Sequence, residues 1–259
     1  MPTRAVLFDL DETLLADNAA TQEALRATAA FGAARRQLDA ETLARAAWLR
    51  AVDGWERSPY QDYFQTFGIS AGECLWGRFI GEDPRLRPIA RWAIDYQLAT
   101  WDQALADLGA RDDILAATLA ERFRMEKRAR HTWLFPEARA ALDRLRETYF
   151  LALITNGAPD IQRDKLAGSG LESYFPVVAV SVEAGVAKPD PAIFAQVLTA
   201  LEVAPGDAVM VGDNPARDIL GANRAGVRAI WIRREGQPLT PGATPDATIS
   251  SLDDLDALL

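Results

Sequence analysis

The stretch that decides the fold is AVLFDLDETLL, residues 5–15. Its first four residues are continuously apolar, which is typical of a short strand buried on both faces of a parallel sheet. This run ends in two aspartates, Asp9 and Asp11, which a single leucine separates. Two neighbouring carboxylates repel each other, and burying them without a partner is costly. We therefore expect a cation beside them, and a metal ion is the simplest candidate because carboxylate oxygens suit hard cations.

Further short apolar runs of the same kind follow later in the chain. They are YFLALIT (149–155), PVVAVS (176–181), AVMVGD (208–213) and RAIWI (228–232). Segments with helical spacing of apolar residues lie between them, for example PEARAALDRLRE and PDPAIFAQVLTALE. Strands that alternate with helices predict a parallel sheet with helices on both faces. The expected fold class is α/β, with a Rossmann-like, doubly wound parallel sheet as the core.

Residues 16–130 have almost no strand signal and several signals for helix starts. Ser58-Pro59 and Asp83-Pro84 each resemble an N-cap followed by proline at the first helical position. After the second of these, one helical face collects Ile89, Trp92, Ala93, Tyr96 and Thr100. We expect about six helices in a separate all-helical domain, inserted after the first strand. The sheet domain would then comprise residues 1–15 and 131–259.

The composition is that of a globular protein, with 49% hydrophobic and 25% charged residues among 259. The net charge of −9 argues against general nucleic-acid binding, which usually needs a basic face. Cys74 is the sole cysteine, which excludes an internal disulfide and a cysteine zinc site. No stretch approaches the ~18 apolar residues of a membrane helix, and Asp9 interrupts the first apolar run, unlike a signal peptide. We expect a cytoplasmic protein without nucleic-acid or membrane partners; its oligomeric state stays open.

Polar residues follow the expected strands at their carboxyl ends, where an open α/β sheet binds its ligand. They are Asp9, Asp11, Thr155, Asn156, Lys188, Asp213 and Asp218. Carboxylates suit Mg²⁺, while a lysine and backbone N–H groups at helix starts suit a phosphoryl group. A carboxylate that the metal does not consume can be a nucleophile, and a second one can be the acid and base.

These segments, in this order, resemble the four motifs of the haloacid dehalogenase superfamily, specifically its phosphatases. DLDET is similar to the first motif, ITNG to the second, Lys188 in AKPDP to the third, and VGDNPARD to the GDxxxxD form of the fourth. The helical segment directly after the first motif looks like a type C1 cap domain. TNG and GVAKPDPAIF look most like the branch that contains nucleotidases and N-acylneuraminate-phosphate phosphatase.

The resemblance implies a catalytic role for three residues. Asp9 would be the nucleophile and a metal ligand. Asp11 would protonate the leaving oxygen and then activate water, and its backbone carbonyl would face the metal. Lys188 would bridge the phosphoryl group and the Asp9 carboxylate. Mg²⁺ and Lys188 would then neutralise the neighbouring carboxylates.

The resemblance also implies roles for the remaining residues of the motifs. Thr155 and the backbone N–H of Asn156 would hold phosphoryl oxygens. Asp213 would bind Mg²⁺, and Asp218 would position Lys188 or a metal-bound water. Taken without the other motifs, Thr155 and Asp218 could each simply cap a helix, and Lys188 would be a solvated surface lysine.

The expected function is Mg²⁺-dependent hydrolysis of a small-metabolite phosphomonoester through an aspartyl-phosphate. Nucleoside monophosphates and sugar phosphates are the expected substrate class, because a long aromatic insert can roof a pocket and stack on a flat group. Another activity of the same family, a phosphomutase or a haloacid dehalogenase, is an alternative, although dehalogenases lack the equivalent of Asp11. A catalytically silent binding protein is a third alternative, and loss of a site residue would be its mark.

Overall fold

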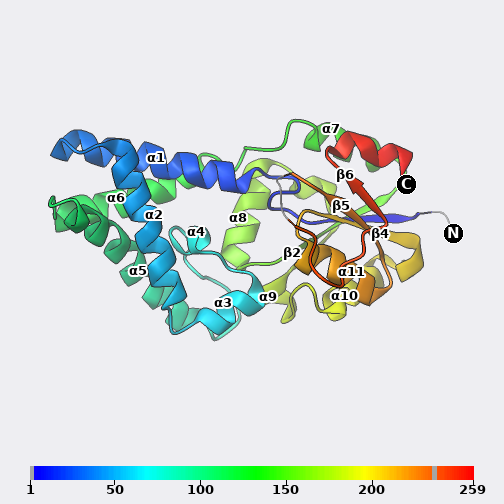
Figure 1. Ribbon diagram of the computed structural model, residues 1–259. Helices are drawn as coiled ribbons and strands as arrows, with labels where there is room; N and C mark the ends of the chain where they lie inside the picture. The colour runs from blue at the N-terminus through cyan, green and yellow to red at the C-terminus, as the bar shows by residue number, and fades with distance from the viewer. Residues whose placement is uncertain (1–2, 235–237) are drawn as a thin grey trace. The chain divides into compact units, whose positions relative to one another are not determined.

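A computed structural model of the chain describes residues 3–234 and 238–259 (Figure 1). The chain forms two compact units. The first, here called the core unit, spans Met1–Asp17, Thr132–Gly157 and Leu166–Leu259. The second, here called the helical unit, spans Asn18–His131 and Ala158–Lys165. In the described part of the chain, no helix has the length and the apolar character needed to cross a membrane.

The core unit is built on a six-stranded sheet with the strand order β3-β2-β1-β4-β5-β6. The strands are β1 (Ala5–Phe8), β2 (Phe150–Thr155), β3 (Val177–Val180), β4 (Ala208–Gly212), β5 (Arg228–Ile232) and β6 (Ala247–Ile249). All neighbouring strands pair in parallel, so the predicted α/β class is confirmed. Only β6 was not predicted, because it has three residues and lies at the sheet edge after a turn-rich loop.

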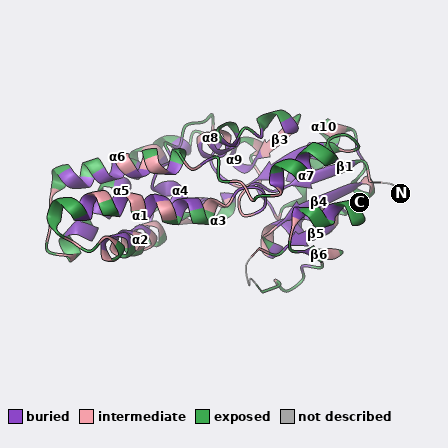
Figure 2. Cartoon of the chain, turned by 90° about the horizontal axis from the view of Figure 1, so that it is seen from above, coloured by how far each residue is buried: buried purple, intermediate pink, exposed green. Residues whose placement is uncertain are grey.

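Helices bury both faces of this sheet, which explains why its strands read as continuously apolar (Figure 2). Val6 and Phe8 pack into one apolar cluster, together with side chains of α7 (Ala138–Leu145). Ala5 and Leu7 point to the opposite face and pack with α10 (Pro191–Leu201) and α11 (Leu220–Ala225). Because successive residues of a strand alternate between faces, one short run serves two hydrophobic layers.

The helical unit contains six helices before the second strand of the sheet. They are α1 (Asp17–Arg36), α2 (Ala40–Glu56), α3 (Gln61–Phe67), α4 (Ala71–Cys74), α5 (Leu86–Asp107) and α6 (Asp113–Arg128). The face predicted on α5 is confirmed: Ile89, Ala93, Tyr96 and Thr100 are buried, and Trp92 is half-buried.

Two predicted helix starts are each two residues early. The α3 helix begins at Gln61 and α5 at Leu86, rather than at the prolines of Ser58-Pro59 and Asp83-Pro84. The Ser58 hydroxyl accepts the N–H of Tyr60 at 3.1 Å, and the Asp83 carboxylate accepts the N–H of Arg85 at 2.9 Å. Both side chains therefore close a tight turn ahead of the helix instead of capping its first turn.

The first part of α8 (Pro159–Ser169) belongs to the helical unit, although it follows β2 of the core unit in the chain. Lys165 forms an ion pair of 3.0 Å with Glu73, and both side chains are buried. The Asp160 carboxylate accepts the N–H groups of Arg78 and Phe79 at 2.9 and 3.0 Å. The predicted insert, residues 16–130, follows chain order and therefore does not include this later segment.

Candidate active site

The carboxyl ends of the three central strands bring several of the predicted site residues together in the core unit. Asp9 directly follows β1, Thr155 is the last residue of β2, and Asp213 directly follows β4. The N–H of Asp9 donates to the carbonyl of Val211 at 3.0 Å, which fixes the end of β1 against β4. Strand pairing therefore places the first and fourth motifs side by side.

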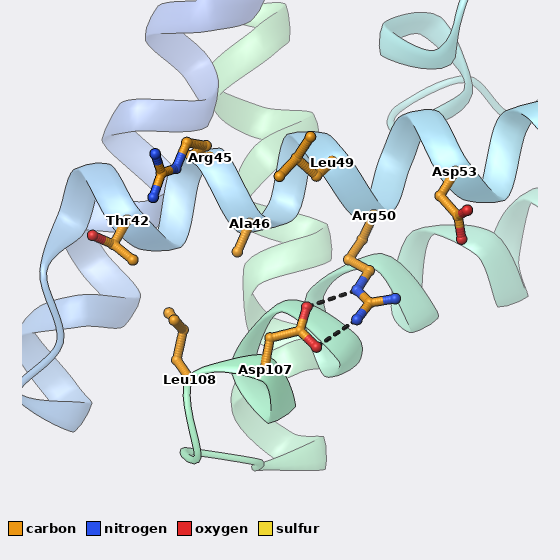
Figure 3. Close-up of a pocket in the computed structure, with 8 residues that line it drawn as sticks. All are labelled: Thr42, Arg45, Ala46, Leu49, Arg50, Asp53, Asp107 and Leu108. Atoms are coloured by element: carbon orange, nitrogen blue, oxygen red, sulfur yellow. Dashed lines mark hydrogen bonds and ion pairs between the residues drawn. The ribbon is translucent and has the colours of Figure 1, made fainter.

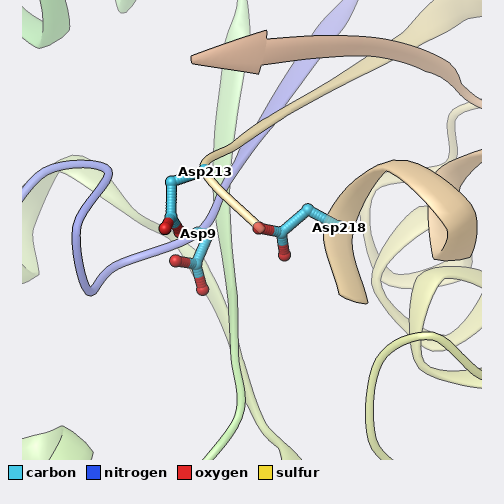
Figure 4. A group of neighbouring side chains, drawn as sticks. All are labelled: Asp9, Asp213 and Asp218. Atoms are coloured by element: carbon cyan, nitrogen blue, oxygen red, sulfur yellow. The ribbon is translucent and has the colours of Figure 1, made fainter. Parts of the chain in front are cut away.

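Three carboxylates converge at this point (Figure 4). Oxygen atoms of Asp9, Asp213 and Asp218 lie within 4.8 Å of one another, a spacing that one metal ion could satisfy. Asp218 comes from a π-helical turn (Pro215–Ile219) that precedes α11. The side chain of Asp11 is half-buried and is not a member of this group.

Lys188 is a fully buried lysine that joins two of these carboxylates. It lies in the loop between α9 (Ser181–Ala184) and α10. Its Nζ lies 2.6 Å from Oδ1 of Asp9 and 2.7 Å from Oδ1 of Asp218, and it donates to the carbonyl of Ile154 at 2.6 Å. With its side chain 1% exposed, the ammonium relies on these oxygens instead of water, so Lys188 is not a surface lysine.

The electrostatics of the group show an excess of negative charge. Burial raises the pKa of Asp9 to about 6; Lys188 opposes this shift and Asp218 adds to it. Burial, with the nearby charges of Asp9 and Asp218, raises the pKa of Asp213 to about 9. Burial alone would lower the pKa of Lys188, but the carboxylates of Asp218 and Asp9 raise it. Three carboxylates facing one ammonium thus form a hard oxygen site that fits a divalent cation.

The absence of a side chain at Gly212 leaves space for the Asp218 carboxylate. A Cβ atom at position 212 would lie 2.3 Å from the carboxylate carbon of Asp218, closer than any real contact. Oδ2 of Asp218 accepts the N–H of Asn214 at 2.9 Å, while Oδ1 pairs with Lys188. The carboxylate of Asp218 therefore faces the lysine and the start of its own turn, and the glycine before Asp213 is a steric requirement.

Thr13 is a site residue to which sequence reasoning gave no role. Its hydroxyl is fully buried, accepts the N–H of Asp213 at 3.1 Å and donates to Oδ2 of Asp9 at 3.4 Å. Thr13 belongs to the quoted DLDET motif, four residues after Asp9. The signal was present in the motif, but the contact spans 200 residues, and only the pairing of β1 with β4 brings it about.

The side chains of Asn156 and Arg217 form a second set of contacts that the sequence did not indicate. Both bind the main chain of Lys188, whereas the sequence suggested only a backbone N–H of Asn156 as a ligand for phosphate. Arg217 lies inside the fourth motif, at a position where GDxxxxD specifies no residue type. A motif of spaced acids cannot show what the residue between them contacts.

The helical unit carries a pocket of its own, with a volume of about 360 Å³ (Figure 3). It is lined by Thr42, Arg45, Ala46, Leu49, Arg50, Asp53, Asp107 and Leu108. Arg50 and Asp107 are paired in its wall, with Nε of the arginine donating to the carboxylate at 2.7 Å. None of the motif residues contributes to this pocket, so it is separate from the carboxylate group.

Comparisons with known proteins agree with this geometry. A family model described as haloacid dehalogenase-like hydrolase matches residues 3–226. A phosphoserine phosphatase of Thermus thermophilus is 39% identical over 250 residues, which cover 96% of each chain. The N-acylneuraminate-9-phosphatase of Mus musculus is 34% identical over 175 residues, 66% of this chain and 71% of its own. Among solved structures, YfnB of Bacillus subtilis has the same fold, with a TM-score of 0.68, 23% identity and coverage of 100% of this chain and 99% of its own.

Proposed function

This chain belongs to the haloacid dehalogenase-like hydrolase family, and we propose that it hydrolyses phosphomonoesters with Asp9 as the nucleophile. Its enzyme class, phosphoric monoester hydrolase, follows from the family and from its phosphatase relatives. The observation that carries the residue assignment is the buried Lys188, whose Nζ contacts both Asp9 and Asp218. A dianionic phosphoryl group needs such a cation next to a carboxylate that attacks it.

In the proposed reaction, a carboxylate oxygen of Asp9 attacks phosphorus and the bond from phosphorus to the ester oxygen breaks. Asp11 gives its proton to the leaving oxygen, which departs as an alcohol. Water then attacks phosphorus in the aspartyl-phosphate, Asp11 takes a proton from that water, and the bond between phosphorus and Asp9 breaks. The products are inorganic phosphate, an alcohol and the original carboxylate. Thr155 and the N–H of Asn156 would hold the phosphoryl oxygens.

We propose Mg²⁺ as the cofactor, held by the carboxylates of Asp9 and Asp213 and the backbone carbonyl of Asp11. The carboxylate of Asp218 would lie next to it. The all-oxygen donor set and the raised pKa values of Asp9 and Asp213 support a hard divalent cation here. When bound, the ion supplies charge that offsets the negative charge of the carboxylates and the phosphoryl group.

We propose that residues 16–130 act as a cap domain that sets substrate class. The relatives named above act on an amino-acid phosphate and on a sugar phosphate. O-phosphoserine is the first substrate to test, because the phosphoserine phosphatase of Thermus thermophilus matches nearly the whole chain. Sugar phosphates and nucleoside monophosphates come next. With Cys74 as its one cysteine, the chain needs no oxidising compartment, and we propose a cytoplasmic location.

The test is phosphate release by the purified full chain from O-phosphoserine, N-acylneuraminate 9-phosphate, a nucleoside monophosphate and an aryl phosphate. We expect turnover with Mg²⁺ and its loss in excess chelator. Asp9→Asn should retain the fold and lose nearly all turnover, since an amide is a poor nucleophile. Asp113→Asn, at a position whose side chain is 88% exposed, is the matched control and should behave like wild type. Full turnover by Asp9→Asn would refute the assignment.

The same panel, with a 2-haloacid added, separates the alternative functions. A haloacid dehalogenase would release halide from a 2-haloacid, and a phosphomutase would convert one sugar phosphate into another without releasing phosphate. A silent binding protein would bind a phosphate ester and leave it intact. Asp11 supports phosphoryl transfer over dehalogenation, and the presence of Asp9, Asp11, Lys188 and Asp213 supports an enzyme over a silent binding protein. The phosphatase relatives support hydrolysis over a phosphomutase.

A further inference from the structure

The main chain of Lys188 is held by side chains instead of by a helix or a sheet. Its N–H donates to Oδ1 of Asn156 at 3.0 Å, and its carbonyl accepts Nδ2 of the same asparagine at 3.0 Å. The carbonyl also accepts Nη1 of Arg217 at 2.9 Å. Lys188 lies between α9 and α10, where no repetitive hydrogen-bond pattern fixes a residue, so these three bonds set its backbone.

Two neighbouring residues of the fourth motif contact opposite ends of this lysine. Asp218 pairs with Nζ at 2.7 Å, and Arg217 donates to the carbonyl at 2.9 Å. Both come from the single π-helical turn Pro215–Ile219, directly after Asp213. The turn that follows one carboxylate of the group therefore holds the lysine at its head and at its backbone.

We propose that Arg217 is a positioning residue for phosphoryl transfer, because it fixes the backbone from which Lys188 reaches Asp9. The inference rests on the proposed role of Lys188. Nζ of Lys188 lies 2.6–2.7 Å from its partner oxygens, so a shift of the Lys188 backbone would disturb these contacts. A misplacement of about 1 Å at a reacting group can cost on the order of 100-fold in rate.

That residue 217 is an arginine indicates that its hydrogen bond to the Lys188 carbonyl matters, and that the side chain does more than fill space. Burial lowers the pKa of Arg217, and the charge of Asp218 opposes that shift, so an apolar side chain would be less costly to bury here. Arginine presents its N–H groups in a rigid fork, which aims one of them at the Lys188 carbonyl while the rest of the side chain packs. Asn156, the first residue after β2, donates to the same carbonyl, so the second, third and fourth motifs meet at one backbone atom.

The experiment compares Arg217→Gln, Arg217→Lys and the control Arg224→Gln in the full chain with Mg²⁺ and an aryl phosphate. Arg224 is an exposed arginine on α11, the helix that follows the same turn. We expect Arg217→Gln to lower kcat on the order of 10-fold or more, with a much smaller change in KM and an unchanged thermal midpoint. Arg217→Lys should recover part of kcat, and Arg224→Gln should match wild type.

Single-turnover rates at high enzyme concentration in a Lys188→Met background separate this role from other causes. If Arg217 acts through Lys188, the double variant Arg217→Gln/Lys188→Met should have the same single-turnover rate as Lys188→Met alone. Equal losses in both backgrounds, or an unchanged kcat for Arg217→Gln, would overturn the inference. Should Arg217→Gln fail to fold, Arg217→Lys alone carries the same comparison. Full activity of Lys188→Met would instead reject the proposed function, so the two failures are distinguishable.

Discussion

The hydroxyl of Thr13 accepts the backbone N–H of Asp213 at 3.1 Å, so one side chain connects the chain after β1 with the first residue after β4. The same hydroxyl donates to Oδ2 of Asp9 at 3.4 Å. A single buried oxygen thus binds both the first and the fourth motif. A carboxylate group that holds a metal needs its members at a fixed spacing, and Thr13 supplies one of the constraints.

Replacing Thr13 with valine tests this constraint. Valine has nearly the same shape but no hydroxyl, so the N–H of Asp213 loses its partner and the chain loses about 1–3 kcal/mol of stability. We expect kcat to fall as well, because Asp9 and Asp213 are no longer held at one distance. Thr13→Ser keeps the hydroxyl and should retain most of both properties. Wild-type kcat and stability in Thr13→Val would contradict the role, and urea titration with steady-state kinetics measures both.

Gly212→Ala should disrupt the site by direct collision. The new Cβ would lie 2.3 Å from the carboxylate of Asp218, which must move and release Nζ of Lys188. We expect kcat to fall on the order of 100-fold. Gly206→Ala is the matched control, because a Cβ there meets no atom within 4 Å. Equal kcat values for Gly212→Ala and Gly206→Ala would show that the reaction does not depend on the position of Asp218.

Glu137 should make the stability of the core unit depend on pH. Its side chain is 13% exposed and pairs with Arg234, which also donates to the carbonyl of Thr13 at 3.0 Å. Burial alone would raise the pKa of Glu137, but the hydrogen bond and charge of Arg234, together with two backbone hydrogen bonds, outweigh it and lower the pKa below its usual 4.5. A lowered pKa means that the ionised form stabilises the fold above pH 4.5, and that this contribution is lost as the pH falls through the folded-state pKa.

The measurement is the free energy of unfolding of wild type and Glu137→Gln across this pH range. We expect the variant to be less stable by about 1.5–3 kcal/mol near neutral pH, the typical value of a hydrogen bond to a charged group. The difference should shrink as the pH falls below 4.5. Glu147→Gln, at an exposed position just after α7, should show no such dependence. A difference that stayed constant with pH would show that the charge of Glu137 is not its cause.

Much of the fold and of the candidate site was predictable because it rests on local patterns. Continuous apolar runs mark strands that are buried on both faces, and polar residues at their ends mark the ligand edge. The contact of Thr13 with Asp213 and that of Arg217 with Lys188 were not predictable, because each joins distant parts of the chain through a residue to which the motifs assign no role. The short strand β6 gave no pattern, since three residues are too few to show a period.

The ion pair between Lys165 and Glu73 gives the last prediction, which concerns the stability of the helical unit. The two side chains are 1% and 5% exposed, and the carboxylate also accepts the N–H of Ser70 at 2.8 Å. The pair joins α8 to α4, two helices that lie 92 positions apart in the chain at these residues. Removing Lys165 takes a cation away from a buried carboxylate, which then keeps only its weaker compensation from hydrogen bonds such as that of Ser70.

We expect Lys165→Met to destabilise the helical unit by about 3–5 kcal/mol. Adding Glu73→Gln should recover a large part of this loss, because the buried carboxylate that lost the charge of Lys165 is then gone. Asp164→Asn, which removes an exposed pair with Arg128, is the control and should cost less than about 1 kcal/mol. Tryptophan fluorescence during urea unfolding is the measurement, since five of the seven tryptophans lie in residues 18–131. A double variant no more stable than Lys165→Met would mean that lost packing, and not the buried charge, causes the effect.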